Sequence, residues 1–122
     1  MTKRTIFAVC AVLVAAAAFL LAAPTKPKTV IHVIQVQWKA DATQDQIAKA
    51  IKGVETMNYP GLKNVWTRPI KMQLPEGYKS IFVMEFASEQ ALKDYANSPA
   101  QKAWYELYMP IREESRTSDI TN

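Results

Sequence analysis

Thr29-Val-Ile-His-Val-Ile-Gln-Val-Gln-Trp-Lys39 is the stretch of sequence that decides the fold. Its β-branched residues alternate with polar ones, which is typical of a β-strand because successive side chains of a strand point to opposite faces. The alternation predicts one face with a single titratable group, formed by Val30, His32, Ile34, Val36 and Trp38. The other face carries Ile31, Val33, Gln35 and Gln37. His32 is the only histidine of the chain, so it is the first candidate for a functional residue.

An apolar stretch before this segment has the layout of an export signal. Lys3 and Arg4 precede an uncharged run over residues 6–23, and Pro24-Thr-Lys-Pro-Lys28 ends the run. A short basic end, an apolar middle and a polar continuation are typical of a cleaved signal peptide. The alternative is an uncleaved membrane anchor, since the run is only slightly shorter than the roughly 20 residues that cross a bilayer.

These patterns divide the chain into three parts. We expect residues 1–23 to be a signal peptide or an N-terminal membrane anchor, and residues 24–29 to be a linker. Residues 30–122 then form one domain that works outside the cytoplasm, in the periplasm or secreted. A contact with the membrane is expected only if the leader stays uncleaved.

Cysteine usage and charge exclude several classes of function. Cys10, the only cysteine, lies within the leader, so the mature domain has no thiol for catalysis, metal binding or a disulfide. Of 15 basic and 11 acidic residues, Lys3 and Arg4 belong to the leader, which leaves 13 against 11, or a net charge of +2. Outside the leader there is no basic block beyond Lys26 and Lys28, so nucleic acid binding is not expected.

The chain after the first strand begins with a helix and two strands. Thr43-Gln-Asp-Gln46 has the spacing of a capping box, and the following helix places apolar residues at helical spacing, at Ile47, Ala50, Ile51 and Val54. Leu62–Ile70 is predicted to be the second strand, with Pro69 at a bulge or edge position. Ser80–Phe86 is apolar enough to be a central third strand.

Two helices and a last strand complete the chain. Ser88 is predicted to cap one helix, and Ser98 with Pro99 begins another that ends near Tyr108. The inward stripe of this last helix is predicted to be Ala100, Ala103, Trp104 and Leu107. Residues 115–121 are predicted to form the last strand.

This order of elements predicts a ferredoxin-like α+β fold, β-α-β-β-α-(α)-β, with helices on one face of an antiparallel sheet. The open face would carry Ile31, Val33 and one of two sets from the third strand: Ile81, Val83 and Glu85, or Phe82, Met84 and Phe86. Such a face is too apolar to remain in water, so we expect a homodimer with the two sheets face to face.

Several segments together resemble the stress-responsive dimeric α/β barrel family, known as Dabb. They are Ile31-His-Val-Ile-Gln-Val-Gln-Trp-Lys-Ala-Asp-Ala-Thr43, Tyr59-Pro-Gly-Leu62, Phe82-Val-Met-Glu-Phe-Ala-Ser-Glu-Gln-Ala-Leu-Lys-Asp-Tyr95 and Ser98-Pro-Ala100. The resemblance covers residue 30 to about residue 120. It implies a ferredoxin-like subunit whose sheet pairs with a second copy to form a barrel, and a possible link to stress.

The resemblance also implies positions for functional residues. A plant enzyme of the family cyclises a linear polyketide to olivetolic acid without a cofactor, using histidine and tyrosine in a pocket between sheet and helices. Its strand histidine falls on His32 and its tyrosine on Tyr95. Its catalytic histidine, two residues after the proline, falls on Gln101, which takes up no proton near neutral pH. The general base of that mechanism is therefore missing here.

We expect a pocket between sheet and helices that encloses a small apolar or aromatic ligand. Its expected lining is His32, Ile34, Val36, Ile51, Val54, Tyr95, Gln101 and Trp104. One histidine with scattered carboxylates gives no metal-ligand spacing, so neither a metal nor another cofactor is expected. Haem ligation by His32 is an alternative, and it would require an open pocket beside the strand.

Three hypotheses remain at this stage for the role of His32 and the function of the domain. The simplest is a histidine at the sheet–helix interface that only forms a hydrogen bond with a neighbour. The second is an exported, dimeric binding module without chemistry. The third is a cofactor-independent cyclase or lyase in which His32 polarises a carbonyl or abstracts a proton and Tyr95 stabilises the resulting oxyanion.

Overall fold

The structure is a computed structural model that describes residues 23–122. The predicted leader lies outside the described residues except for its last position. The elements are β1 (Val30–Trp38), α2 (Gln44–Glu55), β2 (Leu62–Trp66), β3 (Ser80–Phe86), α3 (Glu89–Tyr95), α4 (Pro99–Tyr108), a 3-10 turn (Met109–Ile111) and β4 (Arg112–Ile120). Within the described part of the chain, no helix has the length and apolar character needed to cross a membrane.

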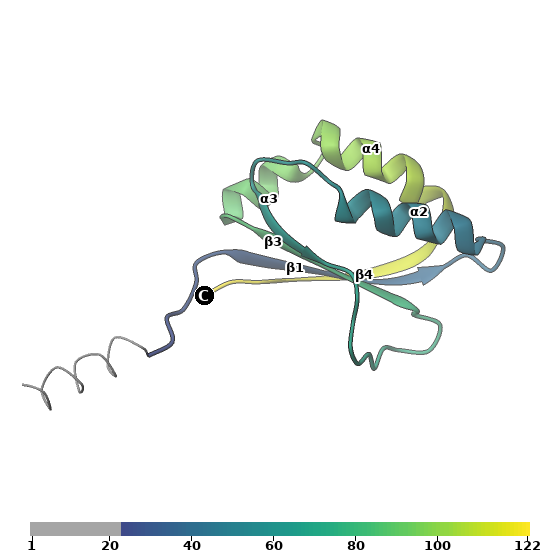
Figure 1. The fold of residues 1–122 in the computed structure, drawn as a ribbon, viewed down its shortest axis with the longest axis horizontal. Helices are drawn as coiled ribbons and strands as arrows, with labels where there is room; N and C mark the ends of the chain where they lie inside the picture. Colours follow the sequence, from purple (N-terminus) through teal and green to yellow (C-terminus); the bar gives the residue numbers. More distant parts are fainter. Residues whose placement is uncertain (1–22) are drawn as a thin grey trace, which may run out of the picture.

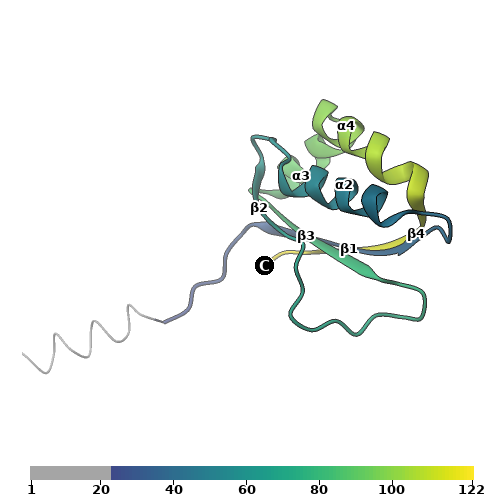
Figure 2. The same ribbon diagram turned by 45° about the vertical axis from the view of Figure 1, so that its right-hand side comes forward.

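The four strands of the described chain form one antiparallel sheet in the order β2-β3-β1-β4. Helices α2, α3 and α4 cover one face of this sheet (Figures 1 and 2). The C-terminus lies beside the start of β1, where Asn122 Nδ2 donates a hydrogen bond to the Pro27 carbonyl at 2.7 Å. The predicted ferredoxin-like α+β fold is confirmed.

The register between β1 and β3 decides which residues of β3 face the helices. Met84 is paired with His32 and Phe82 with Ile34, so both lie on the helix side together with the predicted inner face of β1. Phe82, Met84 and Phe86 are all fully buried there. Ile81, Val83 and Glu85 therefore lie on the open face, opposite Gln35, Val33 and Ile31.

The predicted helix caps are present. Thr43 forms a capping box with Gln46, in which the Thr43 hydroxyl accepts from the Gln46 N–H and the Gln46 side chain accepts from the Thr43 N–H. Ser88 accepts from the Ala91 N–H, and Ser98 accepts from the Gln101 N–H ahead of Pro99. Because Ser98 and Pro99 start α4 directly after α3, Tyr95 and Gln101 lie close to the same corner.

Three predicted details were wrong. β2 ends at Trp66 rather than at Ile70, because Pro69 has no N–H to donate and Ile70 is completely exposed, so neither pairing nor burial holds the chain in the sheet. The bulge of β2 lies between Leu62 and Asn64, not at Pro69. β4 begins at Arg112, before the predicted residue 115, since the 3-10 turn delivers the chain directly into the strand.

The inner face of α4 also differs from the predicted stripe. Trp104 and Tyr108 are almost completely buried, whereas Leu107 is 43% exposed and Ala103 is exposed. Trp104 and Tyr108 stack with ring centroids 4.3 Å apart, and both pack against Phe82. This aromatic stack sets the direction of the helix face, because large rings gain more from burial than alanine does.

The loop of residues 67–79 lies on the side of the sheet opposite the helices (Figure 2). Tyr78 at its end is only 7% exposed, and the Arg116 guanidinium stands 5.1 Å from the centroid of its ring. Gln35, the β1 partner of Arg116, belongs to the open face, so the loop covers one part of that face.

Candidate functional site

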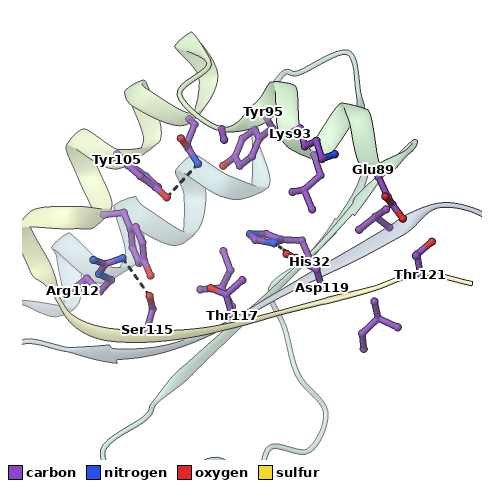
Figure 3. Close-up of a pocket in the computed structure, with 17 residues that line it drawn as sticks. His32, Glu89, Lys93, Tyr95, Tyr105, Arg112, Ser115, Thr117, Asp119 and Thr121 are labelled. Carbon is purple, nitrogen blue, oxygen red and sulfur yellow. Dashed lines mark hydrogen bonds and ion pairs between the residues drawn. The ribbon is translucent and has the colours of Figure 1, made fainter.

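A cavity of about 570 Å³ lies between the sheet and the helices α3 and α4. Val30, His32 and Ile34 of β1 and alternate residues of β4 contribute the sheet side. Leu92 and Tyr95 of α3, and Gln101, Tyr105 and Tyr108 of α4, contribute the helix side. The cavity opens to solvent along β4, where Thr117 and Asp119 are exposed. Figure 3 shows the lining side chains.

His32 is held by Asp119 of β4. The register between β1 and β4 pairs His32 with Asp119, so both side chains lie on the helix side of the sheet. His32 Nδ1 forms a hydrogen bond with Asp119 Oδ1. The imidazole also packs edge-on against Phe86, with ring centroids 6.1 Å apart. Because an ionised carboxylate only accepts hydrogen bonds, Nδ1 is the donor in this pair, and Nε2 is the ring nitrogen left for a ligand.

Tyr95 brings a buried phenol to the same cavity. Its side chain is 2% exposed, and its ring packs between Tyr59 and Phe86 at centroid distances of 5.6 and 5.0 Å. The hydroxyl is buried and has no hydrogen-bond partner in the described part of the chain. Burial raises the pKa of Tyr95 far above its usual range, and Tyr105 and Tyr108 add to this rise. The group is therefore a permanent hydrogen-bond donor.

Gln101 organises the corner between α3 and α4. Its Oε1 accepts from the Asn97 N–H at 2.7 Å, where Asn97 has a left-handed backbone with φ 64°. Its Nε2 donates to the Tyr105 hydroxyl at 3.2 Å. Since that hydroxyl already accepts a hydrogen bond, its own proton is available to a ligand. Gln101 thus orients Tyr105 and supplies no base.

The structure brings four of the expected lining residues to the cavity and leaves the other four outside it. His32, Ile34, Tyr95 and Gln101 line the cavity. Val36, Val54 and Trp104 are instead buried in the core, and Ile51 packs against that core from α2. The physical reason is that α2 packs close to α4, with Trp104 Nε1 donating to the Ala50 carbonyl at 2.9 Å, so these side chains fill the core there and do not line the cavity.

Several residues that β4 and α4 contribute to the cavity were not predicted from the sequence. Asp119, Arg112, Ser115 and Thr117 of β4 all line the cavity, as do Tyr105 and Tyr108 of α4. The available signal was the period of two in β4, which places Ser115, Thr117 and Asp119 on one face. Within residues 23–122, no group of three or more potential ligands is placed to hold a metal ion.

Fold and site together define a ferredoxin-like α+β domain with a cavity the size of a small molecule. The model of the stress-responsive A/B barrel domain matches residues 30–122, and the chain belongs to this family. No curated protein matches the chain.

Solved structures share the fold at low sequence identity. A hydroxynitrile lyase from Passiflora edulis has a TM-score of 0.69 and 17% identity, and the match covers 79% of this chain and 94% of the lyase. A dimeric ferredoxin-like protein of unknown function from Thermobifida fusca has a TM-score of 0.67 and 17% identity, with coverage of 81% and 95%. A Dabb family protein from Mesorhizobium loti has a TM-score of 0.63 and 18% identity, with coverage of 77% and 96%.

The buried phenol of Tyr95 leads to a prediction about stability and pH. In the unfolded chain Tyr95 ionises near its ordinary pKa of about 10, whereas in the folded chain it stays protonated. Above about pH 10 the folded state binds more protons than the unfolded state, so the free energy of unfolding falls as pH rises, by about 1.4 kcal/mol per pH unit for this group. In Tyr95→Phe the free energy of unfolding, measured by urea unfolding above about pH 10, should fall less steeply with pH by this amount.

At neutral pH the same variant should be as stable as the unsubstituted protein or more stable, because it removes a buried hydroxyl that has no partner. Tyr59→Phe is the control, since the Tyr59 hydroxyl donates to the Ala91 carbonyl at 3.3 Å and its loss should cost up to about 1 kcal/mol. An unchanged decline at high pH in Tyr95→Phe would contradict the assignment.

Proposed function

We propose that this domain binds a small molecule with an apolar or aromatic body and at least one hydrogen-bonding group. The single observation that carries the proposal is the cavity of about 570 Å³, which combines an apolar wall with the buried, unpartnered Tyr95 hydroxyl. Small-molecule sites are typically concave and mostly apolar, with a few polar groups that fix orientation. Val30, Ile34 and Leu92 supply the apolar surface, and His32 and Tyr95 supply the polar groups.

A substitution that fills the cavity tests this proposal. Ala96 follows α3, lines the cavity and has an extended backbone that phenylalanine adopts without strain, so Ala96→Phe should occupy part of the space. We expect Ala96→Phe to weaken binding of prodan, a neutral naphthalene dye, at least about tenfold in a fluorescence titration, as the loss of roughly 1.4 kcal/mol of contact implies.

Ala48→Phe is the matched control, because Ala48 is exposed on α2, away from the cavity. It should bind the dye like the unsubstituted protein. Equal binding by both variants, or no binding by the unsubstituted protein, would contradict a ligand cavity at this place.

A second candidate is proton-transfer catalysis in the same cavity, and the His32–Asp119 pair favours it. A histidine oriented by a carboxylate is a common general base, and the Tyr95 hydroxyl is suited to stabilise a developing oxyanion. The lyase from Passiflora edulis shares this fold. In a cleavage of that kind, the base takes the hydroxyl proton of a cyanohydrin, the carbon–carbon bond breaks, and cyanide leaves with the electron pair.

Release of benzaldehyde from mandelonitrile, followed by absorbance, tests the second candidate. If His32 is the base, His32→Asn should lower the rate about a hundredfold or more, and Asp119→Asn should lower it less, because the imidazole remains. Turnover at the uncatalysed rate by the unsubstituted protein contradicts a lyase function and leaves binding as the function.

We further propose a homodimer in which the open faces of two sheets pack together. Ile31, Val33, Ile81 and Val83 lie half-buried on this face, and Trp66 beside them is 51% exposed. A contiguous apolar surface of this kind is typical of an interface between subunits. The related structure from Thermobifida fusca is described as dimeric, which supports the proposal.

Val83 is paired with Val33 on one side and Trp66 on the other, so it lies near the middle of the open face. Val83→Glu should convert the dimer into single copies in analytical ultracentrifugation, because a buried carboxylate without a partner is costly. Ala48→Glu, at an exposed position of α2 on the helix side of the sheet, should leave the dimer intact. A single-copy mass for the unsubstituted protein at high concentration would contradict the dimer.

We also propose that the domain works outside the cytoplasm, carried there by residues 1–23. The basic start, apolar middle and polar continuation support this proposal. The mass of the protein isolated from its own host separates a cut near residue 23 from an uncleaved anchor. Recovery of the full chain from the cytoplasm would contradict both.

A further inference from the structure

Arg112 places a positive charge at one end of the cavity. It is the first residue of β4, and Figure 3 shows it with Ser115 at the end away from Glu89 and Thr121. Its Nη1 donates to Ser115 Oγ at 3.3 Å, and its guanidinium carbon stands 5.6 Å from the centroid of the Tyr108 ring. Arg112 is partly buried, yet within residues 23–122 it forms no ion pair. Most of its five N–H donors therefore remain available.

Two tyrosines next to Arg112 add donors and no negative charge. Tyr108 is 1% exposed, and its buried hydroxyl has no hydrogen-bond partner in the described part of the chain. Burial raises the pKa of Tyr108, although the nearby Ser115 hydroxyl and Arg112 guanidinium favour its ionised form, so the phenol stays protonated. The Tyr105 hydroxyl accepts from Gln101 and keeps its own proton for a ligand. A buried donor without a partner is costly, which is expected where a ligand completes the site.

We propose that the ligand carries a carboxylate, and that Arg112 and Tyr108 bind it. This inference rests on the proposed ligand-binding function and names its substrate class: an aromatic or aliphatic carboxylic acid. The planar guanidinium matches the two oxygens of a carboxylate, and hydrogen bonds to ionised groups are about twice as strong as neutral ones. The apolar body of the acid then lies along Ile34 and Leu92.

The distribution of charge along the cavity fixes the direction of the ligand. Arg112 lies at one end, whereas Asp119 lies beside His32, and Glu89 and Lys93 lie toward the other end (Figure 3). At the far end the charge of Glu89 offsets that of the exposed Lys93, and Asp119 adds a negative charge. Arg112 forms no ion pair within residues 23–122, so it attracts a carboxylate to the opposite end. The end of the ligand remote from the carboxylate is thereby presented to His32 Nε2. Arg112 is therefore a specificity-determining residue.

A matched pair of probes tests the proposal on the full chain. Cinnamate and cinnamamide have the same aromatic body and nearly the same shape, and only cinnamate is charged. In isothermal calorimetry the unsubstituted protein should bind cinnamate about ten- to a hundredfold more tightly than cinnamamide, which is the usual strength of a hydrogen bond to a charged group. Arg112→Gln should reduce this ratio to near one without weakening the amide.

Three further variants make the test specific. Arg68→Gln, an exposed arginine on the loop after β2, should keep the full preference. Arg112→Lys keeps the charge and loses the planar fork, so it should restore the preference in part. Tyr108→Phe removes an unpartnered hydroxyl, so it should fold normally and lose several-fold of the cinnamate affinity.

The outcomes separate this inference from the function on which it rests. Equal binding of the two probes by the unsubstituted protein overturns the carboxylate site and leaves the ligand cavity standing. A preference that survives Arg112→Gln in a folded protein overturns the role of Arg112. If the unsubstituted protein binds neither cinnamate nor cinnamamide, and does not bind prodan either, the ligand-binding function of the cavity is overturned.

Discussion

The antiparallel pairing of β1 with β4 is the constraint on which the rest of the site depends. This pairing places Asp119 opposite His32, Thr117 opposite Ile34 and Ser115 opposite Val36, so every second residue of β4 faces the helices. A shift of one residue would turn Asp119 to the open face and leave His32 without its carboxylate. The set of functional groups in the cavity therefore depends on the register between β1 and β4.

Aromatic packing forms the other half of the constraint. Trp104 and Tyr108 stack and bury α4 against Phe82, while Tyr95 and Phe86 join α3 to the sheet. This packing closes the side of the sheet under α2 and α4. The cavity lies over β1 and β4, where β4 contributes polar side chains such as Ser115 and Thr117. The result is a cavity whose floor is set by the sheet register and whose roof is set by large rings.

Much of the fold could be predicted because its signals are local. The alternation in β1, the caps at Thr43, Ser88 and Ser98, and the apolar run of β3 each determine an element with little help from distant residues. The choice between the two faces of β3 was left open by the sequence, because either set of side chains is apolar enough to be covered. Only the register with β1 decides it.

The site was half predictable for the same reason. His32 and Ile34 follow from the alternation of the first strand, and Tyr95 and Gln101 follow from the resemblance to the family; all four line the cavity. Asp119 and Arg112 could not be predicted as site residues from the sequence, because β4 is polar on both faces, as in a strand that is exposed to solvent. Their importance appears only when the pairing with β1 brings them to the cavity. Val36, Val54 and Trp104 were expected in the lining and lie in the core, since no sequence pattern distinguishes the wall of a cavity from the interior beside it.

The central claim is that a small carboxylic acid occupies the cavity between Arg112 and His32. A crystal structure of the protein isolated from its own host, without added ligand, tests this claim most directly. We expect residual density beside the Arg112 guanidinium and the Tyr108 hydroxyl, extending toward His32, and a small acid released on denaturation and detected by mass spectrometry. A cavity closed by its own side chains, with Arg112 paired to a carboxylate of the chain, would contradict it.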